Sequence, residues 1–230
     1  MRSANRFLLK LSGEALGAGG IDPRALASLT AQIARVQSLD IELAIVVGGG
    51  NFIRGAQLQS LDRVIADQMG MLATVLNGMA LRQSLESRGI SVILQSAVPV
   101  AYAQPIDPVS ARRALSEGKI VIFAGGTGNP FVTTDTAAAI RASEIGAKIL
   151  LKATDVPGVY SADPKKNPKA KLYKELTLDE AIEKRLNVMD LTALTLCREN
   201  KITIRVFDVF REGNLERAIR GELVGTVVRP

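Results

Sequence analysis

Short apolar runs alternate along the chain with longer segments in which apolar residues recur at every third or fourth position. Runs of roughly four to eight apolar residues between turn residues are typical of buried strands, whereas the longer spacing is typical of amphipathic helices. Because the runs are continuously apolar, we expect the α/β class, with a mainly parallel sheet covered by helices on both faces in a three-layer αβα sandwich. Strands are predicted at residues 7–11, 43–47, 91–94, 120–124, 149–151 and 202–207, with a possible edge strand at 226–228.

Capping residues mark the predicted helices. Asp22 and Asp107 each precede a proline, which places an N-cap oxygen before a ring suited to the first helical position. Thr177 and Glu180 have the spacing of a capping box. Helices are predicted at residues 22–38, 62–88, 107–118, 134–145, 181–186 and 189–199, and Asn214 is expected to cap a further short helix.

One long helix and one loop bear on the domain organisation. Within the helix predicted at 62–88, apolar side chains share one face, as in a helix that packs on a sheet; they are Leu72, Val75, Leu76 and Met79. Residues 163–171 are rich in proline and lysine and are expected to form a loop, but the helical pattern resumes directly after them. We therefore expect a single domain, residues 1–230, with two functional halves at about 1–147 and 148–230.

The composition excludes several kinds of chemistry. The 230 residues include no His, no Trp and one Cys, Cys197, which excludes His-dependent catalysis, a disulfide framework and thiolate metal clusters. The formal charge is 29 − 23 = +6; this balance permits an anionic ligand and does not call for a nucleic-acid partner. Since no stretch approaches the roughly 18 apolar residues of a membrane span and no signal peptide is evident, we expect a cytoplasmic protein with no membrane partner.

Glycines directly follow three of the predicted strands, at Gly13, at residues 48–50 and at residues 125–128. In an open α/β sheet the carboxyl ends of the strands bind ligands, and glycine there lets backbone N–H groups approach an anion. This arrangement favours a nucleotide or other anion over ordinary turn chemistry. The fingerprints of P-loop proteins, dinucleotide-binding folds and protein kinases are absent. What remains suits phosphoryl transfer, which depends on positioning and charge neutralisation and needs no His.

Lys10 is the most distinctive charged residue of the predicted strands, because it lies within the apolar run at 7–11. Such a side chain is costly unless its ammonium group reaches a wet site. The position therefore favours contact between Lys10 and the phosphates of a bound ligand at the end of the strand.

Seven segments resemble the bacterial uridylate kinases (UMP kinases), a family of the amino-acid kinase superfamily. They are residues 10–16 (KLSGEAL), 48–55 (GGGNFIRG), 69–74 (MGMLAT), 126–131 (GTGNPF), 152–154 (KAT), 158–164 (GVYSADP) and 188–191 (VMDL). The resemblance covers essentially the whole chain. It implies the amino-acid kinase fold and the reaction ATP + UMP → ADP + UDP in pyrimidine nucleotide biosynthesis, with Mg²⁺, a homohexamer and allosteric control.

The resemblance also implies roles for individual residues. Catalytic roles fall to Lys10, Asp135 and Asp190. ATP contacts fall to Lys10, Leu11, Ser12, Gly13, Gly50, Arg54, Thr154, Tyr160 and Asp163. UMP contacts fall to Gly49, Asp67, Thr127, Gly128, Asn129, Pro130, Phe131, Val132, Thr133 and Thr134. The UMP and phosphate side would then lie mainly in residues 1–147 and the ATP side in 148–230, with Mg²⁺ held by the ATP phosphates and by no direct protein ligand.

The sequence departs from the family pattern at two places. Residues 16–20 form a short uncharged segment where members of the family carry a longer loop linked to GTP activation. Pro157 stands where an acidic residue is common, which removes one backbone N–H near the implied adenine site.

Several of these residues also have a purely structural interpretation. Asp135 and Asp190 lie near predicted helix starts, where a carboxylate is favoured by capping or by the helix dipole. Thr133 or Thr134 could be the N-cap of the helix at 134–145, and Lys152 could form a salt bridge instead of facing phosphate.

Two other functions are compatible with this reading. One is a carboxylate, carbamate or isopentenyl phosphate kinase of the same fold. The other is a nucleotide-binding storage or regulatory protein without catalysis, against which the joint presence of Lys10, Asp135 and Asp190 argues.

Overall fold

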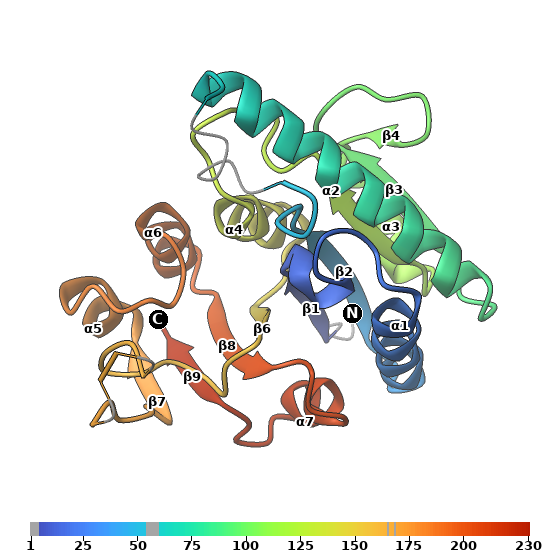
Figure 1. Cartoon of the computed structure of the whole chain (residues 1–230). Coiled ribbons are helices and arrows are strands. Elements are labelled where there is room, and N and C mark those ends of the chain that lie inside the picture. Colours follow the sequence, from blue (N-terminus) through green and yellow to red (C-terminus); the bar gives the residue numbers. More distant parts are fainter. Residues whose placement is uncertain (1–4, 54–59, 165, 168) are drawn as a thin grey trace.

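The computed structural model describes residues 5–53, 60–164, 166, 167 and 169–230, whose strands form one nine-stranded sheet (Figure 1). The strands lie in the order β4-β3-β5-β2-β1-β6-β8-β9-β7. Their bounds are β1 Arg6–Leu11, β2 Glu42–Val47, β3 Val92–Ser96, β4 Gln104–Pro105, β5 Ile120–Ala124, β6 Ile149–Thr154, β7 Glu175–Thr177, β8 Thr203–Asp208 and β9 Thr226–Arg229. Neighbouring strands are parallel except β8 and β9, so the carboxyl ends of β5, β2, β1 and β6 lie side by side.

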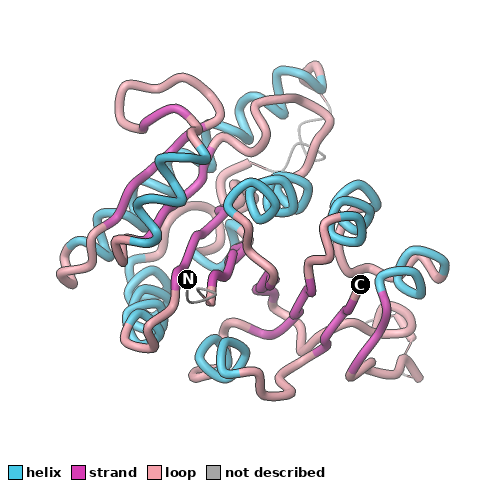
Figure 2. The backbone as a smooth tube through the Cα atoms, turned by 180° about the vertical axis from the view of Figure 1, so that it is seen from behind, coloured by secondary structure: helices cyan, strands magenta, loops and turns pink. Residues whose placement is uncertain are grey.

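Helices cover both faces of the sheet (Figure 2). One face carries α3 Pro108–Ser116, α4 Thr134–Ile145, α5 Leu178–Glu183 and α6 Leu191–Glu199. The other face carries α1 Pro23–Gln37, α2 Arg63–Glu86 and α7 Asn214–Arg220, and the short 3₁₀ helix η1 Gly13–Leu16 follows β1. In β1, Leu8 packs toward the first set of helices and Leu9 toward the second, which explains why successive positions of the strand are apolar. The predicted αβα sandwich is confirmed.

Some local expectations were wrong. The strand predicted as an edge at 226–228 lies inside the sheet, between β8 and β7. The short strands β4 and β7 and the helix η1 were not predicted. Gly213, with a left-handed φ of 81°, caps α7 in place of Asn214, whose side chain instead donates to the carbonyl of Asp208 at 2.9 Å. These differences arise from tertiary pairing, which local sequence does not encode.

By length and composition alone, α2 is long and apolar enough to cross a membrane, with a mean hydropathy of 1.3 over its most apolar stretch. Of that stretch, however, 44% is buried inside the protein. Its buried residues are mostly small or apolar, among them Ala66, Ala73, Val75, Leu81 and Leu85. The expected common face is therefore split: Val75 is buried, whereas Leu72 and Leu76 are half exposed. The apolar side chains of α2 thus lie on two faces, one packed on the sheet and one at the outer surface.

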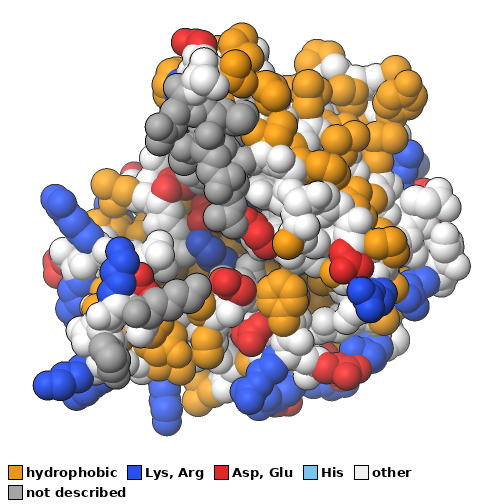
Figure 3. Space-filling model, in the orientation of Figure 1, with side chains coloured by type: hydrophobic (Ala, Val, Ile, Leu, Met, Phe, Trp, Pro, Cys, Tyr) orange, Lys and Arg blue, Asp and Glu red, His pale blue; other side chains and the backbone are white. Residues whose placement is uncertain are grey.

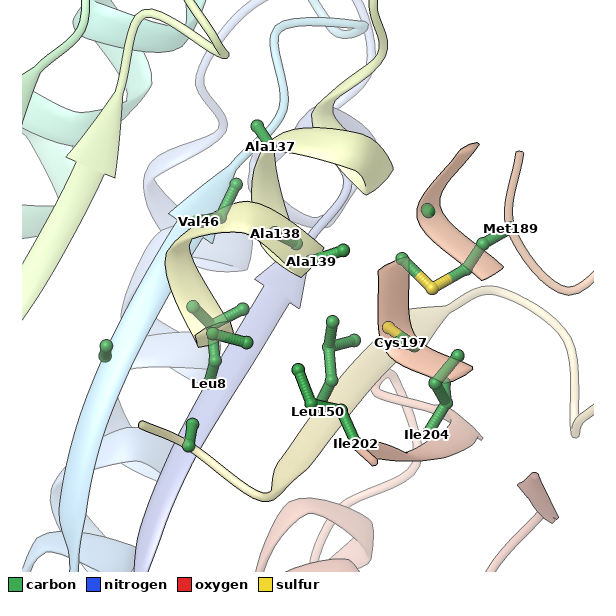
Figure 4. Packing of buried hydrophobic residues seen from close by; sticks show 14 of the residues in the cluster. Leu8, Val46, Ala137, Ala138, Ala139, Leu150, Met189, Cys197, Ile202 and Ile204 are labelled. Atoms are coloured by element: carbon green, nitrogen blue, oxygen red, sulfur yellow. The ribbon is translucent and has the colours of Figure 1, made fainter. Parts of the chain in front are cut away.

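Small side chains bring α4 close to the sheet. Ala137, Ala138 and Ala139 are buried in one cluster with Leu8 of β1 and Val46 of β2 (Figure 4). A methyl group occupies little space, so the helix axis can approach the strands more closely than with larger side chains. The same cluster holds Cys197, and burial raises the pKa of its thiol to about 12, which leaves it unreactive at neutral pH.

The close approach of α4 gives a first prediction. Replacing Ala138 by Leu should destabilise the protein by about 1–3 kcal/mol, because the added side chain has no room between α4 and the sheet. Urea unfolding measures the change. Ala27→Leu, at an exposed position of α1, is the control and should stay within about 0.5 kcal/mol of the wild type. Equal stability of the two variants would contradict this packing.

Candidate active site

Two lysines and one aspartate form a buried group at the carboxyl end of the central strands. Lys10 on β1 and Lys152 on β6 are direct neighbours in the parallel register. Asp135, in the first turn of α4, lies between them: its Oδ1 is 2.7 Å from Lys10 Nζ and its Oδ2 accepts from Lys152 Nζ at 2.7 Å. The three side chains are only 11–16% exposed. Of the residues predicted to be catalytic, Lys10 and Asp135 are thus in direct contact.

The charges of this group depend on one another. Burial alone would raise the pKa of Asp135, but the ammonium groups of Lys10 and Lys152 outweigh it and hold that pKa below the usual range. Burial lowers the pKa of Lys152, the Asp135 carboxylate opposes the shift, and the nearby Lys10 charge adds to it. The aspartate therefore stays ionised, and its single negative charge keeps two cations together in a site of low exposure.

Asp190 holds the helices around this group. Its carboxylate accepts from the Thr133 and Thr136 hydroxyls, the latter at 2.7 Å, and from the backbone N–H of Ala193 at 3.0 Å. It is thereby the N-cap of α6 and also fixes the start of α4, where Thr133 is the N-cap. Among the predicted catalytic residues, Asp190 is thus placed to position Asp135 through α4.

The glycine turns after β1 and β2 are in direct contact. A side chain at Gly13 would lie 2.6 Å from the N atom of Gly50, and one at Gly49 would lie 2.7 Å from the carbonyl oxygen of Gly70 in α2. Only a residue without Cβ allows these approaches. The predicted convergence of the glycine turns is confirmed for these two loops, which bring their backbone N–H groups next to the end of β1.

Two buried polar residues of α2 hold the glycine turns in place. The side-chain amides of Asn77 and Asn51 pair with each other at 2.7 and 3.1 Å, and Asn77 also donates to the carbonyl of Gly48 at 2.7 Å. The hydroxyl of Thr74 accepts from the N–H of Gly125 at 2.6 Å. One helix therefore fixes the turns that follow β2 and β5.

A pocket of about 460 Å³ opens between α2 and these turns, and we call it the α2 pocket. Seven of the residues predicted to contact UMP line it: Gly49, Asp67, Thr127, Asn129, Val132, Thr133 and Thr134. Gly50, predicted for ATP, lines the same pocket, together with Ile53, Ala66, Gly70, Met71, Thr74 and Gly126. Its volume and its mixed polar and apolar wall suit a small ligand such as a nucleoside monophosphate.

Asp67 is already engaged at the edge of the α2 pocket. The Nε of Arg63 donates to its two carboxylate oxygens at 2.9 and 3.0 Å, and the backbone N–H of Phe131 donates to Oδ2 at 2.8 Å. Phe131 itself is mostly exposed and lies outside the pocket wall. Gly128 and Pro130 belong to the same loop and are likewise not among the lining residues.

A second pocket of about 400 Å³ follows the end of β6, and we call it the β6 pocket. Tyr160 and Asp163, both predicted for ATP, line it, as do Gly158, Ser161 and residues 184–187. Its wall is fastened to β9, because the buried Thr226 hydroxyl accepts from the N–H of Val159 at 2.9 Å. Thr154 lies beside this pocket and uses its hydroxyl in a turn with Val156.

Leu11 and Ser12, also predicted for ATP, lie at the end of β1. Leu11 has its side chain in the core and its carbonyl accepts from the N–H of Gly48 at 2.8 Å. Ser12 precedes η1 and makes no side-chain cap. Arg54 lies outside the described residues.

The sequence analysis missed the residues that position the site from α2 and β6. Thr74 and Asn77 had a recognisable signal, because they are polar residues that interrupt the apolar periodicity of a helix and are nevertheless buried. For Lys152 the sequence allows either a salt bridge or a phosphate contact, and in the structure Lys152 forms a salt bridge with Asp135. Residues 184–187 of the β6 pocket follow α5 and carried no pattern that indicated a site.

The donor atoms fit a magnesium ion that is held mainly by a nucleotide. Within the described part of the chain, no group of three or more His, Cys, Asp and Glu side chains could hold a metal ion. Both oxygens of Asp135 face lysines. Mg²⁺ in kinases is commonly bound through substrate phosphates and water with few protein carboxylates.

The comparisons with known proteins agree with one another. The sequence profile of the amino acid kinase family matches residues 5–208. The uridylate kinase of Magnetococcus marinus is 52% identical, over 98% of this chain and 96% of that protein. The structures of the UMP kinases of Bacillus anthracis and Ureaplasma parvum match with TM-scores of 0.94 and 0.93, at 37% and 36% identity, over 99% and 100% of this chain and 97% and 100% of theirs. The chain therefore belongs to the amino acid kinase family and, within it, to the uridylate kinases.

Proposed function

We propose that this chain transfers the γ-phosphoryl group of ATP to UMP, giving ADP and UDP. The observation that carries the proposal is the Lys10–Asp135–Lys152 group at the ends of β1 and β6. In the sheet, β1 lies between β2 and β6. Lys10 on β1 therefore lies between β2, whose following turn lines the α2 pocket, and β6, which carries Lys152 and precedes the β6 pocket. Cations between two nucleotide-sized pockets suit transfer between two phosphates.

The chemistry follows from this arrangement. An oxygen of the UMP phosphate attacks the γ-phosphorus of ATP, the bond from that phosphorus to the β,γ-bridging oxygen breaks, and ADP leaves with the electron pair. The phosphate oxygen is already anionic, so no general base is needed. Lys10 and Lys152 neutralise charge on the transferring group, and the N–H groups of the glycine turns add donors that are fixed before the reaction.

Mg²⁺, when bound with ATP, supplies further neutralisation of the β- and γ-phosphates. The residues of this chain do the rest. Asp135 keeps the two ammonium groups at a fixed separation, and Asp190 keeps α4 in place through Thr133 and Thr136. We assign Lys10 the catalytic role and give Asp190 a positioning role.

The two pockets are formed by different halves of the chain, and we propose that each binds one nucleotide. UMP takes the α2 pocket, lined by residues from the first 134 positions, and the adenosine of ATP takes the β6 pocket, lined by residues from 156 onward. The relatives at about half identity over nearly the full chain are uridylate kinases, which favours UMP over a carboxylate or carbamate acceptor. We propose that the enzyme acts in the cytoplasm and takes part in pyrimidine nucleotide biosynthesis.

An exposed apolar stripe on α2 supports self-association, for which we propose the homohexamer. Ile65, Leu72 and Leu76 of α2 are about half exposed and recur at helical spacing, and the exposed Leu61 lies just before the N-cap of the helix. In the space-filling view, apolar side chains gather along α2 and over the neighbouring β4 segment at the upper right (Figure 3). An apolar stripe of this length is unfavourable in water, and a second copy of α2 would cover it with the same kind of surface, as a twofold interface requires.

The acceptor can be tested directly. We expect ADP release in a coupled assay with ATP, Mg²⁺ and UMP, and the measurement is repeated with CMP, aspartate and N-acetylglutamate as matched acceptors. Turnover with a non-nucleotide acceptor alone would overturn the assignment. So would nucleotide binding without phosphoryl transfer to any acceptor, which would indicate a storage or regulatory protein.

Lys10→Ala should lower kcat by roughly 100-fold or more, the scale of losing one donor to the transition state. The fold should persist, because Asp135 keeps Lys152 as its partner. Circular dichroism checks the fold, and steady-state kinetics give kcat. Lys119→Ala removes an ammonium group that pairs with Glu117 at the surface and should leave the rate unchanged. A folded Lys10→Ala enzyme with a near-normal rate would remove Lys10 from the mechanism.

The double variant Leu72→Glu, Leu76→Glu should dissociate the assembly, because charges would have to be buried against a second copy. Sedimentation velocity should show a smaller particle than the wild type. Leu223→Glu, another exposed leucine, serves as the control and should not change the mass. A wild-type protein that sediments as a monomer, or a double variant of unchanged mass, would show that this stripe is not an interface.

A further inference from the structure

Arg63 joins the start of α2 to the loop that borders the α2 pocket. Its Nε contacts both oxygens of Asp67, one helical turn along, at 2.9 and 3.0 Å. Its guanidinium carbon lies 5.7 Å from the centre of the Phe131 ring, within cation–π range. Because Phe131 also donates its N–H to Asp67 at 2.8 Å, the three residues close a ring of contacts that we call the clasp.

The backbone at Phe131 needs such support. Its φ is +66°, in the left-handed region that a bulky side chain adopts only at a cost. The side chain is 66% exposed, so packing in the core does not compensate. Among the described residues, Phe131 makes a backbone hydrogen bond to Asp67 and a ring contact with Arg63. These hold residue 131 in its conformation.

The clasp also orients the carboxylate of Asp67. The side chain of Asp67 is 18% exposed and lines the pocket, whereas that of Arg63 is 61% exposed and does not line it. With Nε shared between both oxygens and Phe131 on Oδ2, rotation of the carboxylate is restricted. The carboxylate therefore presents a defined edge to the pocket before any ligand arrives.

We propose that Arg63 is a positioning residue that preforms the acceptor pocket by clasping residues 126–133 to α2 through Asp67 and Phe131. This inference rests on the proposed function only in naming UMP as the ligand. Because the loop is already ordered in the folded protein, nucleotide binding does not have to supply the free energy of ordering it. Arg63 thereby acts on acceptor affinity and not on the chemical step.

Kinetics with purified enzyme test the proposal. Arg63→Ala should raise KM for UMP by roughly three- to tenfold, the combined scale of one exposed ion pair and one cation–π contact. It should leave kcat and KM for ATP within about twofold, because Arg63 touches neither the lysines nor the β6 pocket. Arg63→Lys keeps the charge but loses the planar group and should give an intermediate KM.

The matched control is Arg113→Ala, which breaks the same kind of Arg–carboxylate pair, with Glu117 four residues along, on the exposed side of α3. It should leave all three constants unchanged. A fall in KM for UMP on replacing Arg63 would overturn the proposal, since Arg63 would then compete with the ligand for Asp67. An unchanged KM would also overturn it, since the pair would be a surface contact only.

Hydrogen exchange on the nucleotide-free protein gives a readout that does not depend on activity. In Arg63→Ala, the amides of residues 126–134 should exchange several-fold faster, with Phe131 most affected, while those of β6 stay protected. Equal exchange in the variant and the wild type would refute the clasp. If the wild type failed to phosphorylate UMP, the proposed function would fall, and the exchange experiment would still decide whether Arg63 holds the loop.

Discussion

Two ammonium groups on neighbouring strands of a buried sheet repel each other unless an anion lies between them. Lys10 and Lys152 are in this position, and Asp135 is the anion. A carboxylate can reach both only if the first turn of α4 lies directly over β1 and β6. The alanines of α4 allow this approach, because larger side chains would keep the helix away from the strands. The reactive geometry is thus a consequence of how closely one helix packs.

On the opposite face of the sheet, α2 holds the glycine turns in place. Glycine gives the loops after β1 and β2 the room to touch, but it also gives them conformational freedom. Helix α2 restricts that freedom with side chains that end inside the turns, Asn77 at Gly48 and Thr74 at Gly125. Each of these polar groups is buried and paired, so it fixes a backbone position at little net cost. One helix therefore shapes the pocket while its outer stripe faces away from it.

The fold class, most element positions and part of the site could be predicted because they depend on residue type and local order. A lysine inside an apolar strand, and glycines after strands, indicate a site without knowledge of the neighbours. The remaining features depend on tertiary partners. Asn51 and Asn77 are far apart in sequence and meet only when α2 packs. The placement of β9 between β8 and β7 follows from strand pairing that no local pattern encodes. Asn214 does not cap α7 because its side chain donates to the carbonyl of Asp208. Asp190 has the sequence of a helix cap, and only the structure shows that it serves two helices at once.

Burial divides the ionic contacts of the site into two kinds. The Lys10–Asp135–Lys152 group is almost out of reach of water, so breaking it would leave a buried charge without a partner, which is costly. In the Arg63–Asp67 pair only Asp67 is shielded, at 18% exposure, whereas Arg63 is 61% exposed, so water can replace the partner of Arg63 at small cost if the contact breaks. Phosphoryl transfer needs the cations at a fixed distance throughout, whereas a nucleotide has to enter and leave past Asp67. The strength of each contact therefore matches the motion required there. The Lys10–Asp135–Lys152 group holds the cations rigidly, whereas the weaker Arg63–Asp67 contact keeps the α2 pocket formed and still lets a nucleotide pass.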